Sequence, residues 1–453
     1  MSVQPARRVA YEVIRAVSES DAYANLLLPV KLDRARLRGA DAALATELTY
    51  GTLRRRGYYD SVIEAAAGRP IGQLDAPVLD VLRLAVHQLL SMRVAQHAAV
   101  DEAVSLAREV GSRSATGFVN AVLRTVTRTR PEEWRARVVG SATTQDDRLA
   151  AEHAHPAWIV RAFRRALEAD GRDGELEELL AADNLAPRVS LTALPGLARP
   201  EELAGAAPGR FSPFAQASDG GDPARWPAVR EGRARVQDEG SQLAALALSR
   251  ARPVVEGERW LDLCAGPGGK AALLAAEAFA GGATLVANEI IPARATLVRR
   301  ALSAFPDPPQ VLNQDGREIG DRFAAQFDRI LLDAPCTGLG ALRRRPEARW
   351  RKQPKDVPEL TRLQTELVDS AARALRPGGI LAYVTCSPHL AETRTIVGQA
   401  LEHGGLTALD TGGVLDSFTL ERLELGTSLQ VQLWPHRHGT DAMFIALLEK
   451  QRQ

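Results

Sequence analysis

The 453-residue sequence predicts a multidomain protein: an all-helical N-terminal bundle, a small α/β linker region, and a C-terminal α/β domain with a mostly parallel, doubly wound sheet. Three observations predict this. Apolar residues recur at helical spacing over residues 1–135, proline and glycine punctuate residues 136–235, and short apolar strands alternate with helices over residues 236–453. We therefore expect domain boundaries near residues 135 and 235, within the number of domains that this length allows.

Composition places the chain among ordinary globular proteins, with 45% apolar and 25% charged residues. No apolar run reaches the ~20 residues that cross a bilayer, and the first thirty residues lack the apolar core of a signal peptide. We therefore expect a cytoplasmic protein without membrane contact. The net charge of +1 neither favours nor excludes a nucleic-acid partner.

Helical periodicity is clearest at the N-terminus, where Val9, Val13 and Val17 share one face of a predicted helix. The predicted helices are Ala6–Val17, Asp41–Gly51 with Gly51 as its C-terminal cap, Val78–Leu90, Ala98–Val110 and Thr116–Arg128. Arginines recur at Arg54–Arg56 and at Arg124, Arg128 and Arg130. They are either solvated charges or an RNA-gripping surface.

The linker region contains a predicted helix over Ala157–Ala169 and a strand over Arg188–Thr192. The strand–helix alternation that follows predicts helices at Ser241–Arg250, Lys270–Phe279, Pro292–Ala304 and Val357–Leu375. The predicted strands are Arg259–Leu263, Thr284–Asn288, a strand at Val311, Phe327–Leu332, Ile380–Val384, Val431–Trp434 and Met443–Leu448.

All three cysteines stand where a predicted strand of this sheet stops: Cys264, Cys336 and Cys386. Sheets of this class bind ligands outside the carboxyl ends of their strands. One isolated cysteine is most often a small buried apolar residue. Three at strand ends favour a reactive role, and a structural disulfide is the alternative for one pair.

A glycine-rich loop joins strand Arg259–Leu263 to the next helix. A Walker phosphate loop is excluded by the glycine spacing and by Ala271, which stands where Ser or Thr would bind magnesium. The Gly-x-Gly-x-x-Gly dinucleotide pattern is absent as well. Asp262 stands four residues before Gly266, a pattern that resembles class I S-adenosylmethionine methyltransferases; a plain tight turn is the alternative.

Two acids follow the next strands of the predicted sheet. Glu289 ends the strand after the glycine loop, where an acid commonly accepts hydrogen bonds from ribose hydroxyls, and a solvated helix-capping acid is the alternative. Asp315 ends the third strand, near the expected position of an adenine. The glycine that follows Asp315 leaves a turn aspartate as a rival interpretation.

Both halves of the sequence resemble one known family. Glu47–Arg56 and Gly117–Arg124 resemble the NusB-type RNA-binding helical domain, in the version fused to the Sun/RsmB (Fmu) family of ribosomal RNA cytosine methyltransferases. Asp333–Cys336 with Thr385–Ser387 resembles the two-cysteine signature of RNA 5-methylcytosine methyltransferases. Gln237–Gln242, Arg344–Trp350, Glu392 and Asp441–Phe444 also fall in the order of that family.

The resemblance implies a Rossmann-like class I methyltransferase fold and S-adenosylmethionine as the methyl donor. It implies that Cys386 attacks carbon 6 of a cytosine, that Cys336 assists release, and that Asp333 binds the base edge. Arg343–Arg345 would touch the flanking RNA backbone, with a solvated turn as the alternative. The cofactor-binding residues that it implies are Leu263, Cys264, Ala265, Gly266, Pro267, Gly268, Gly269, Lys270, Glu289, Arg294, Asp315 and Asp333.

The substrate expected from the resemblance is a cytidine of small-subunit (16S) ribosomal RNA, and the enzyme is expected to be a monomer without a metal. Two alternatives stay open. The same chemistry could act on transfer RNA or large-subunit ribosomal RNA, because the NusB-like part favours the small subunit by analogy only. A non-enzymatic RNA-binding assembly factor is the alternative from another class, and the intact cysteine pair and glycine loop argue against it.

Overall fold

The computed structural model describes residues 3–20, 22–111, 113–140, 142–403, 405–425 and 428–452. The chain divides into two compact units. The helical unit comprises Met1–Arg164, Asp173–Ala186 and Leu342–Arg351, and the sheet unit comprises Arg165–Arg172, Pro187–Ala341 and Lys352–Gln453. The domain boundaries at residues 135 and 235 stay a prediction. No helix of the described residues is both long and apolar enough to span a membrane.

A large hydrophobic core within the helical unit is formed by buried residues between Val3 and Ala154, as the periodicity predicts. Val9, Val13, Ile14 and Val17 of the first helix are all buried in it. Its helices are α1 (Pro5–Glu19), α2 (Ala24–Arg34), α3 (Gly39–Arg54), α4 (Arg56–Ala67), η1 (Ile71–Gln73), α5 (Ala76–Ser91), α6 (Gln96–Val110), α7 (Arg113–Arg128), α8 (Pro131–Val139), α9 (Gln145–His153), α10 (Ala157–Ala169), whose last residues belong to the sheet unit, η2 (Asp173–Glu175), α11 (Leu176–Ala182) and α17 (Ala348–Arg351). Helices α2 and α4 were not predicted from the sequence.

The predicted cap at Gly51 is wrong, because α3 continues through it to Arg54. Gly51 lies against α5, and a Cβ there would stand 2.2 Å from Cε1 of His87. The glycine therefore permits close helix packing and does not end the helix. Arg54 is only 5% exposed, so it is neither a solvated charge nor a free RNA contact. The guanidinium of Arg55 lies 4.9 Å from the ring centroid of Tyr58.

A late segment of the chain, Leu342–Arg351, completes the helical unit. Arg349 is fully buried and donates hydrogen bonds to the carbonyl oxygens of Arg54 and Asp183, at 2.8 and 2.7 Å. Trp350 packs against the helical core, and a Cβ at Gly57 would stand 2.3 Å from its indole. This segment therefore belongs structurally with residues almost 300 positions earlier.

A small antiparallel sheet precedes the main one in the chain, with the strand order β2-β3-β1-β4. Its strands are β1 (Val189–Ala193), β2 (Ala207–Pro208), β3 (Ala215–Ser218) and β4 (Ala234–Val236). The short helices η3 (Pro200–Leu203), η4 (Pro223–Arg225) and α12 (Pro227–Arg230) connect them. The strand predicted at Arg188–Thr192 is present as β1, whereas a separate α/β subdomain over residues 136–235 stays a prediction, because Pro187–Ala341 belongs to the sheet unit as a whole.

The main sheet has the strand order β10-β12-β9-β8-β5-β6-β7, and β11 pairs with β12. Strands β5 to β9 are parallel, whereas β12 joins β9 antiparallel and carries β10 and β11 antiparallel to itself. The strands are β5 (Arg259–Asp262), β6 (Thr284–Asn288), β7 (Gln310–Leu312), β8 (Phe327–Asp333), β9 (Leu375–Thr385), β10 (Leu406–Ala408), β11 (Gln430–Gln432) and β12 (Phe444–Lys450).

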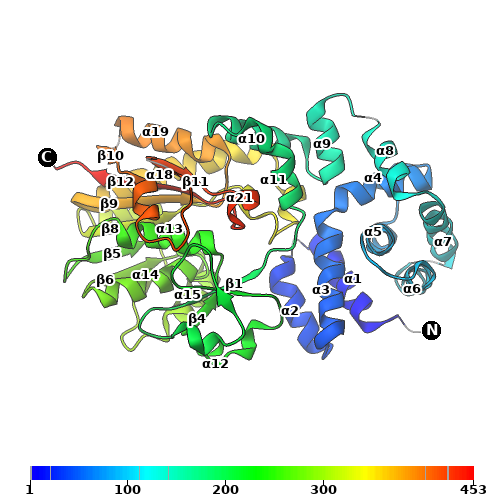
Figure 1. Cartoon of the computed structure of the whole chain (residues 1–453), viewed down its shortest axis with the longest axis horizontal. Coiled ribbons are helices and arrows are strands. Elements are labelled where there is room, and N and C mark those ends of the chain that lie inside the picture. Colours follow the sequence, from blue (N-terminus) through cyan, green and yellow to red (C-terminus); the bar gives the residue numbers. More distant parts are fainter. Residues whose placement is uncertain are drawn as a thin grey trace. The chain divides into compact units, whose positions relative to one another are not determined.

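Helices cover both faces of this sheet (Figure 1). Along β9, Ile380, Ala382 and Val384 belong to the hydrophobic cluster with α13 and α14, whereas Leu381 and Tyr383 belong to the cluster with α18 and α19. This alternation is the period of two that a strand buried on both faces requires. The helices of the sheet unit are α13 (Glu239–Arg250), α14 (Gly269–Ala280), α15 (Pro292–Leu302), η5 (Gly316–Glu318), α16 (Ile319–Arg322), η6 (Leu339–Ala341), η7 (Pro354–Asp356), α18 (Val357–Ala374), η8 (Leu390–Glu392), α19 (Arg394–His403), α20 (Thr411–Asp416) and α21 (Pro435–His438).

Candidate active site

The three cysteines follow three neighbouring parallel strands of the main sheet. Cys264 follows β5, Cys336 follows β8 and Cys386 follows β9, and these strands are adjacent in the order β9-β8-β5. The Sγ atoms of Cys336 and Cys386 lie 3.5 Å apart, although 50 residues separate them in the chain. All three thiols are free, so no disulfide joins any pair. The fold therefore brings two of the three predicted sulfurs into contact.

Cys264 differs from this pair. It packs against the hydrophobic cluster that contains Leu261 and Leu263. Burial, together with the negative charge of Asp262, raises the pKa of the Cys264 thiol well above its ordinary value. A thiol in such a place stays neutral and behaves as a small apolar residue.

The glycine loop runs from β5 into α14, as predicted. Gly268 has a φ of +86°, and a Cβ there would stand 2.6 Å from Cβ of Ala301 and 3.1 Å from Cα of Val298. Glycine is therefore required at this position on two grounds, backbone conformation and space. Gly266 also has a positive φ, of +57°, but a Cβ there would meet no atom within 4 Å. The surface beside Gly266 is thus open.

Two hydrogen bonds hold this loop to the end of β6. The backbone N–H of Gly266 donates to Oε2 of Glu289 at 3.0 Å, and that of Ala265 donates to the carbonyl of Asn288 at 2.8 Å. The other carboxylate oxygen of Glu289 accepts from the N–H of Ile291 at 2.9 Å. Glu289 is therefore placed beside the loop, and it also fixes the loop's shape.

Asp315 and Arg294 stand further from these contacts. Asp315 caps the turn η5 by accepting from the N–H of Arg317 at 3.0 Å, which is the geometry of the turn aspartate that the sequence left open. Hydrogen bonding to the Arg317 side chain lowers the pKa of Asp315. Arg294 is exposed in the first turn of α15, and its side chain makes no hydrogen bond to the other predicted site residues that the structure describes.

Asp262 is a fully buried carboxylate that accepts no side-chain hydrogen bond from the described residues, and only the charge of Lys270 and the backbone of Cys264 act to lower its pKa. Burial first, and then the negative charge of Asp333, raise the pKa of Asp262 to about 8. A buried acid without a side-chain partner costs free energy in an unliganded protein. Such a group is suited to receive a cation from a ligand.

Lys270 and Asp333 form an ion pair beside the sulfur pair, with Nζ and Oδ2 2.7 Å apart. Burial alone would lower the pKa of Lys270, but Asp333 and the sulfur of Cys386 raise it above its ordinary value. The ammonium of Lys270 therefore stays charged, and Cys386 is among the groups whose charge interacts with it. The sequence ranked Lys270 as a minor residue, whereas the structure places it at the centre of the site.

Cys336 has the opposite electrostatic environment. Its hydrogen bond with Cys386, its burial and the negative charges of Cys386, Glu392 and Asp333 together raise the pKa of the Cys336 thiol well above its ordinary value. Cys336 is therefore held as a neutral thiol by its hydrogen bond with Cys386, by burial and by the negative charges around it.

The arginines after the Cys336 loop are not all available to a ligand. Arg343 is only 6% exposed and belongs to the helical unit, so its predicted contact with an RNA backbone is not supported by its position. Arg345 is exposed and Arg344 is partly exposed. The motif Arg344–Trp350 was recognised in the sequence. The sequence did not indicate that Arg349 would be buried and would anchor this segment in the helical unit.

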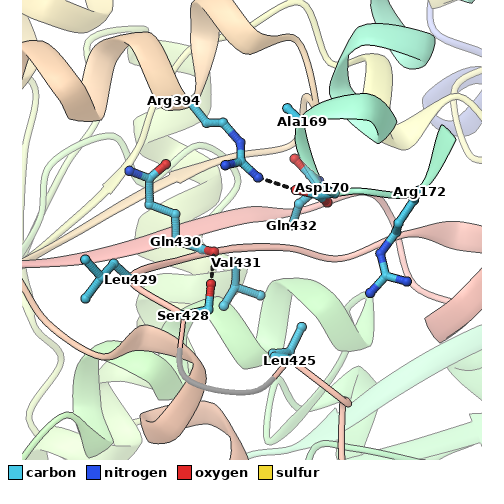
Figure 2. A pocket seen from close by; sticks show the side chains of 10 residues that line it. All are labelled: Ala169, Asp170, Arg172, Arg394, Leu425, Ser428, Leu429, Gln430, Val431 and Gln432. Carbon is cyan, nitrogen blue, oxygen red and sulfur yellow. Dashed lines mark hydrogen bonds and ion pairs between the residues drawn. The ribbon is translucent and has the colours of Figure 1, made fainter.

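A separate cavity of about 370 Å³ lies in the sheet unit, away from the residues of this site (Figure 2). Its lining comes from the end of α10, from Arg394 and from the segment around β11. Arg394 points toward Asp170 and forms an ion pair with it, and the indole N–H of Trp434 donates to the same carboxylate. Its lining contains none of the predicted cysteines or acids, so it adds nothing to the chemistry of the site.

One group of side chains among the described residues could hold a metal ion: Glu152, His153 and Glu177 of the helical unit. Glu152 already pairs with Arg135. Burial lowers the pKa of His153. Whether a metal takes part in the function is untested, and its absence stays a prediction.

Comparisons with known proteins agree with this architecture. Residues 251–449 match the family model of the 16S rRNA methyltransferase RsmB/F, and residues 4–128 match the model of the NusB family. A Mycobacterium tuberculosis protein named only as a methyltransferase is 50% identical over 99% of this chain and 97% of its own length. The ribosomal RNA small subunit methyltransferase B of Pseudomonas putida is 31% identical over 86% of this chain and 87% of its own length.

Solved structures share the fold at low sequence identity. The crystal structure of PH0851 has a TM-score of 0.80 at 24% identity, and it covers 99% of this chain and 100% of its own. NSun6 from Pyrococcus horikoshii, solved with SFG, has a TM-score of 0.55 at 17% identity, with 66% and 100% coverage. With a NusB match at one end, a methyltransferase match at the other and a relative that is 31% identical over 86% of the chain, the chain belongs to the RsmB/F family of RNA methyltransferases.

Proposed function

We propose that this enzyme transfers a methyl group from S-adenosylmethionine to carbon 5 of a cytidine in small-subunit ribosomal RNA, through a covalent bond between Cys386 and carbon 6. The observation that carries the proposal is the contact between Cys336 and Cys386, 3.5 Å apart at the ends of adjacent strands. Beside them stand the glycine loop and the Lys270–Asp333 ion pair.

Two sulfurs suit this reaction for a chemical reason. Carbon 5 of cytosine is a weak nucleophile, and thiolate addition at carbon 6 moves electron density onto carbon 5. After methylation, carbon 5 must lose its proton and the enzyme must be expelled. Cys386, near the Lys270 ammonium, suits the attack, and Cys336, held as a thiol by its raised pKa, suits the release.

Asp333 is proposed to bind the N3/N4 edge of the cytosine. It ends β8 only three residues before Cys336, and its side chain is partly exposed. Its ion pair with Lys270 fixes the carboxylate, so that it can accept a hydrogen bond from the exocyclic amino group and orient the ring for attack by the thiolate. The base must leave its stack to reach this group, which is a physical reason for a separate RNA-binding part.

The residues of the loop fit S-adenosylmethionine. The buried carboxylate of Asp262, which has no side-chain partner among the described residues, is suited to the ammonium of the cofactor's amino-acid end, and the open surface at Gly266 leaves room for it. When bound, the cofactor supplies an electrophilic methyl group on a sulfonium centre. The residues proposed to hold it are those named from the sequence, Leu263–Lys270 with Glu289, Asp315, Asp333 and Arg294, and the exposed Arg294 has the least support from its position.

The small-subunit target is proposed from the names of the relatives, such as the Pseudomonas putida enzyme, and from the NusB match. Bisulfite sequencing of ribosomal RNA from a strain without this gene should show the loss of one 5-methylcytidine in the small-subunit RNA. An unchanged small-subunit RNA with a loss in transfer RNA or large-subunit RNA would move the substrate there. No loss in any RNA would favour a non-enzymatic assembly role. Cytoplasmic location and a monomeric state stay predictions.

The chemistry is tested separately with purified protein. The Cys386→Ala variant should lose methyl transfer while it still binds RNA. The Cys336→Ala variant should accumulate a covalent protein–RNA adduct, visible as a slow band on a denaturing gel in the presence of cofactor. A fully active Cys386→Ala enzyme would refute the nucleophile, and the lack of any adduct band with Cys336→Ala would refute the release role.

A further inference from the structure

The proposed chemistry requires that two sulfurs on different loops stay in contact, and one buried residue connects those loops. Glu392 ends the short helix η8 and has no exposed surface. A buried carboxylate is costly unless several donors or a cation satisfy it. Every hydrogen-bond partner of Glu392 among the described residues is a neutral group.

Two of these partners, Thr337 and Ser387, immediately follow the two cysteines in the chain. Thr337, next to Cys336, donates its backbone N–H to Oε1 of Glu392 at 2.7 Å and its hydroxyl to Oε2 at 2.5 Å. Ser387, next to Cys386, donates its hydroxyl to the same Oε2 at 2.6 Å. One carboxylate therefore holds the residue after each sulfur.

A third element completes the clamp. Gln364 of α18 donates from Nε2 to Oε1 of Glu392 at 3.4 Å and to the carbonyl of Pro335 at 2.8 Å. An ionised carboxylate offers about four acceptor positions, and these four donors use all of them. A glutamine at this position could keep all four contacts, because its amide N–H groups can donate to the two hydroxyl oxygens, so only an apolar side chain of similar size removes them.

The charge of Glu392 also opposes ionisation of its neighbour, because it contributes to the raised pKa of Cys336. A carboxylate this close to a reactive pair is therefore unfavourable for forming a thiolate on the Cys336 side. The presence of Glu392 is explained if it mainly holds the two cysteine loops together and keeps Cys336 protonated.

We propose that Glu392 is a positioning residue that sets the separation of the Cys336 and Cys386 sulfurs through Thr337 and Ser387, without touching the substrate. The link to methyl transfer rests on the proposed function above. The geometric part does not, because the distance between two thiols can be probed without RNA or cofactor.

The probe is phenylarsine oxide, which condenses with two neighbouring thiols to form two As–S bonds and releases one water. Each thiol loses its proton to that water, and no redox change occurs. Bridging of the full-length protein is followed by intact mass after a wash with a monothiol, which removes arsenic bound to a single cysteine. In the wild type, we expect one bridge that disappears in Cys386→Ala.

The test variant is Glu392→Met, which keeps the approximate size of the side chain and removes its hydrogen-bonding end, and the matched control is Glu258→Met. Glu258 is also a buried glutamate of the sheet unit, but it holds Trp260 and Arg329 and has no contact with either cysteine loop. Glu392→Met should slow bridging at least tenfold and lower kcat for methyl transfer tenfold or more, with KM for RNA within twofold. Glu258→Met should lower the unfolding midpoint but leave the bridging rate within twofold.

Bridging of Glu392→Met at the wild-type rate would overturn the proposal, whatever its activity. If Glu392→Met does not fold, Thr337→Val and Ser387→Ala replace it, since each removes one hydroxyl donor, and each should slow bridging by a smaller factor. Wild-type rates in both would equally overturn it. If the wild type bridges but methylates no RNA, the proposed function fails while the bridging rates still decide the role of Glu392.

Discussion

Each of the two units contains a fully buried charged side chain whose described hydrogen bonds all go to neutral groups, but only one of the two side chains is connected to reactive groups. In the helical unit, Arg349 donates to backbone carbonyls and to the amide oxygen of Asn184. In the sheet unit, Glu392 accepts from hydroxyl, amide and backbone donors. Each joins segments that are remote in the chain, but only Glu392 joins segments that carry reactive groups.

The difference lies in what each charge faces. Burial lowers the pKa of Arg349 to about 10, so the guanidinium stays protonated. It donates hydrogen bonds to carbonyl groups at helix ends that would otherwise lack a partner. Glu392 instead acts on a thiol next to it. A buried charge can therefore serve stability alone or the geometry of a reaction, and its partners tell which.

The largest expected effect comes from replacing Arg349, the buried charged residue of the helical unit. Arg349→Met would leave the carbonyls of Arg54 and Asp183 and the amide oxygen of Asn184 buried without donors, which should cost about 3–5 kcal/mol of unfolding free energy. Urea unfolding measures this loss. Arsenical bridging of the two thiols should proceed at the wild-type rate in native buffer. A loss below about 1 kcal/mol would show that Arg349 is not a structural anchor.

A smaller effect is expected at the glycine loop, where two neighbouring positions provide an internal control. Gly268→Ala should cost about 3 kcal/mol, because its positive φ is strained and its Cβ would clash with Ala301. Gly266→Ala has a positive φ but open space, so we expect about 1 kcal/mol. Unfolding in urea measures both, and equal losses would contradict the packing argument.

The third effect is a pH dependence from Asp262, which sharpens the comparison between paired and unpaired buried acids. Its folded pKa of about 8 lies above the unfolded value, so the folded state binds the proton more tightly and stability falls as the pH rises between the two values. From about pH 5 to about pH 8, Asp262→Asn should gain at least about 1.4 kcal/mol relative to wild type.

The paired counterpart is Asp80 of the helical unit, which is also buried but lies 2.8 Å from the guanidinium of Arg83. Burial raises the pKa of Asp80, and the charge of Arg83 opposes that shift. Asp80→Asn should therefore destabilise the protein at both pH values. Urea unfolding at the two pH values tests both variants, and a pH-independent difference between wild type and Asp262→Asn would contradict the assignment.

Much of the fold could be predicted because local patterns carry it. The run Ile380–Val384 predicted the centre of β9, but the strand begins at Leu375, since the Pro-Gly-Gly that precedes the run resembles a turn and conceals the start. Gly51 was mistaken for a helix cap because a sequence does not show which glycine faces a neighbouring helix. Both errors come from tertiary contacts that override local signals.

The residues of the site also divide into those that local patterns predicted and those that depend on tertiary contacts. The positions of Cys336 and Cys386 at strand ends followed from apolar runs, and their contact followed from strands being neighbours in the sheet. The central place of Lys270 was underestimated, because its partner Asp333 lies 63 residues away. The four donors that converge on Glu392 come from separate segments, so no spacing pattern could have identified them.

The position of Leu342–Arg351 within the helical unit has a practical consequence for dissecting the molecule. The chain enters and leaves the sheet unit more than once, so a single cut cannot isolate either unit intact. A truncated protein that starts at Pro187 would keep this segment without the residues around it. The guanidinium of Arg349 and the indole of Trp350 would then face solvent, and such a fragment should aggregate more readily than the full-length protein.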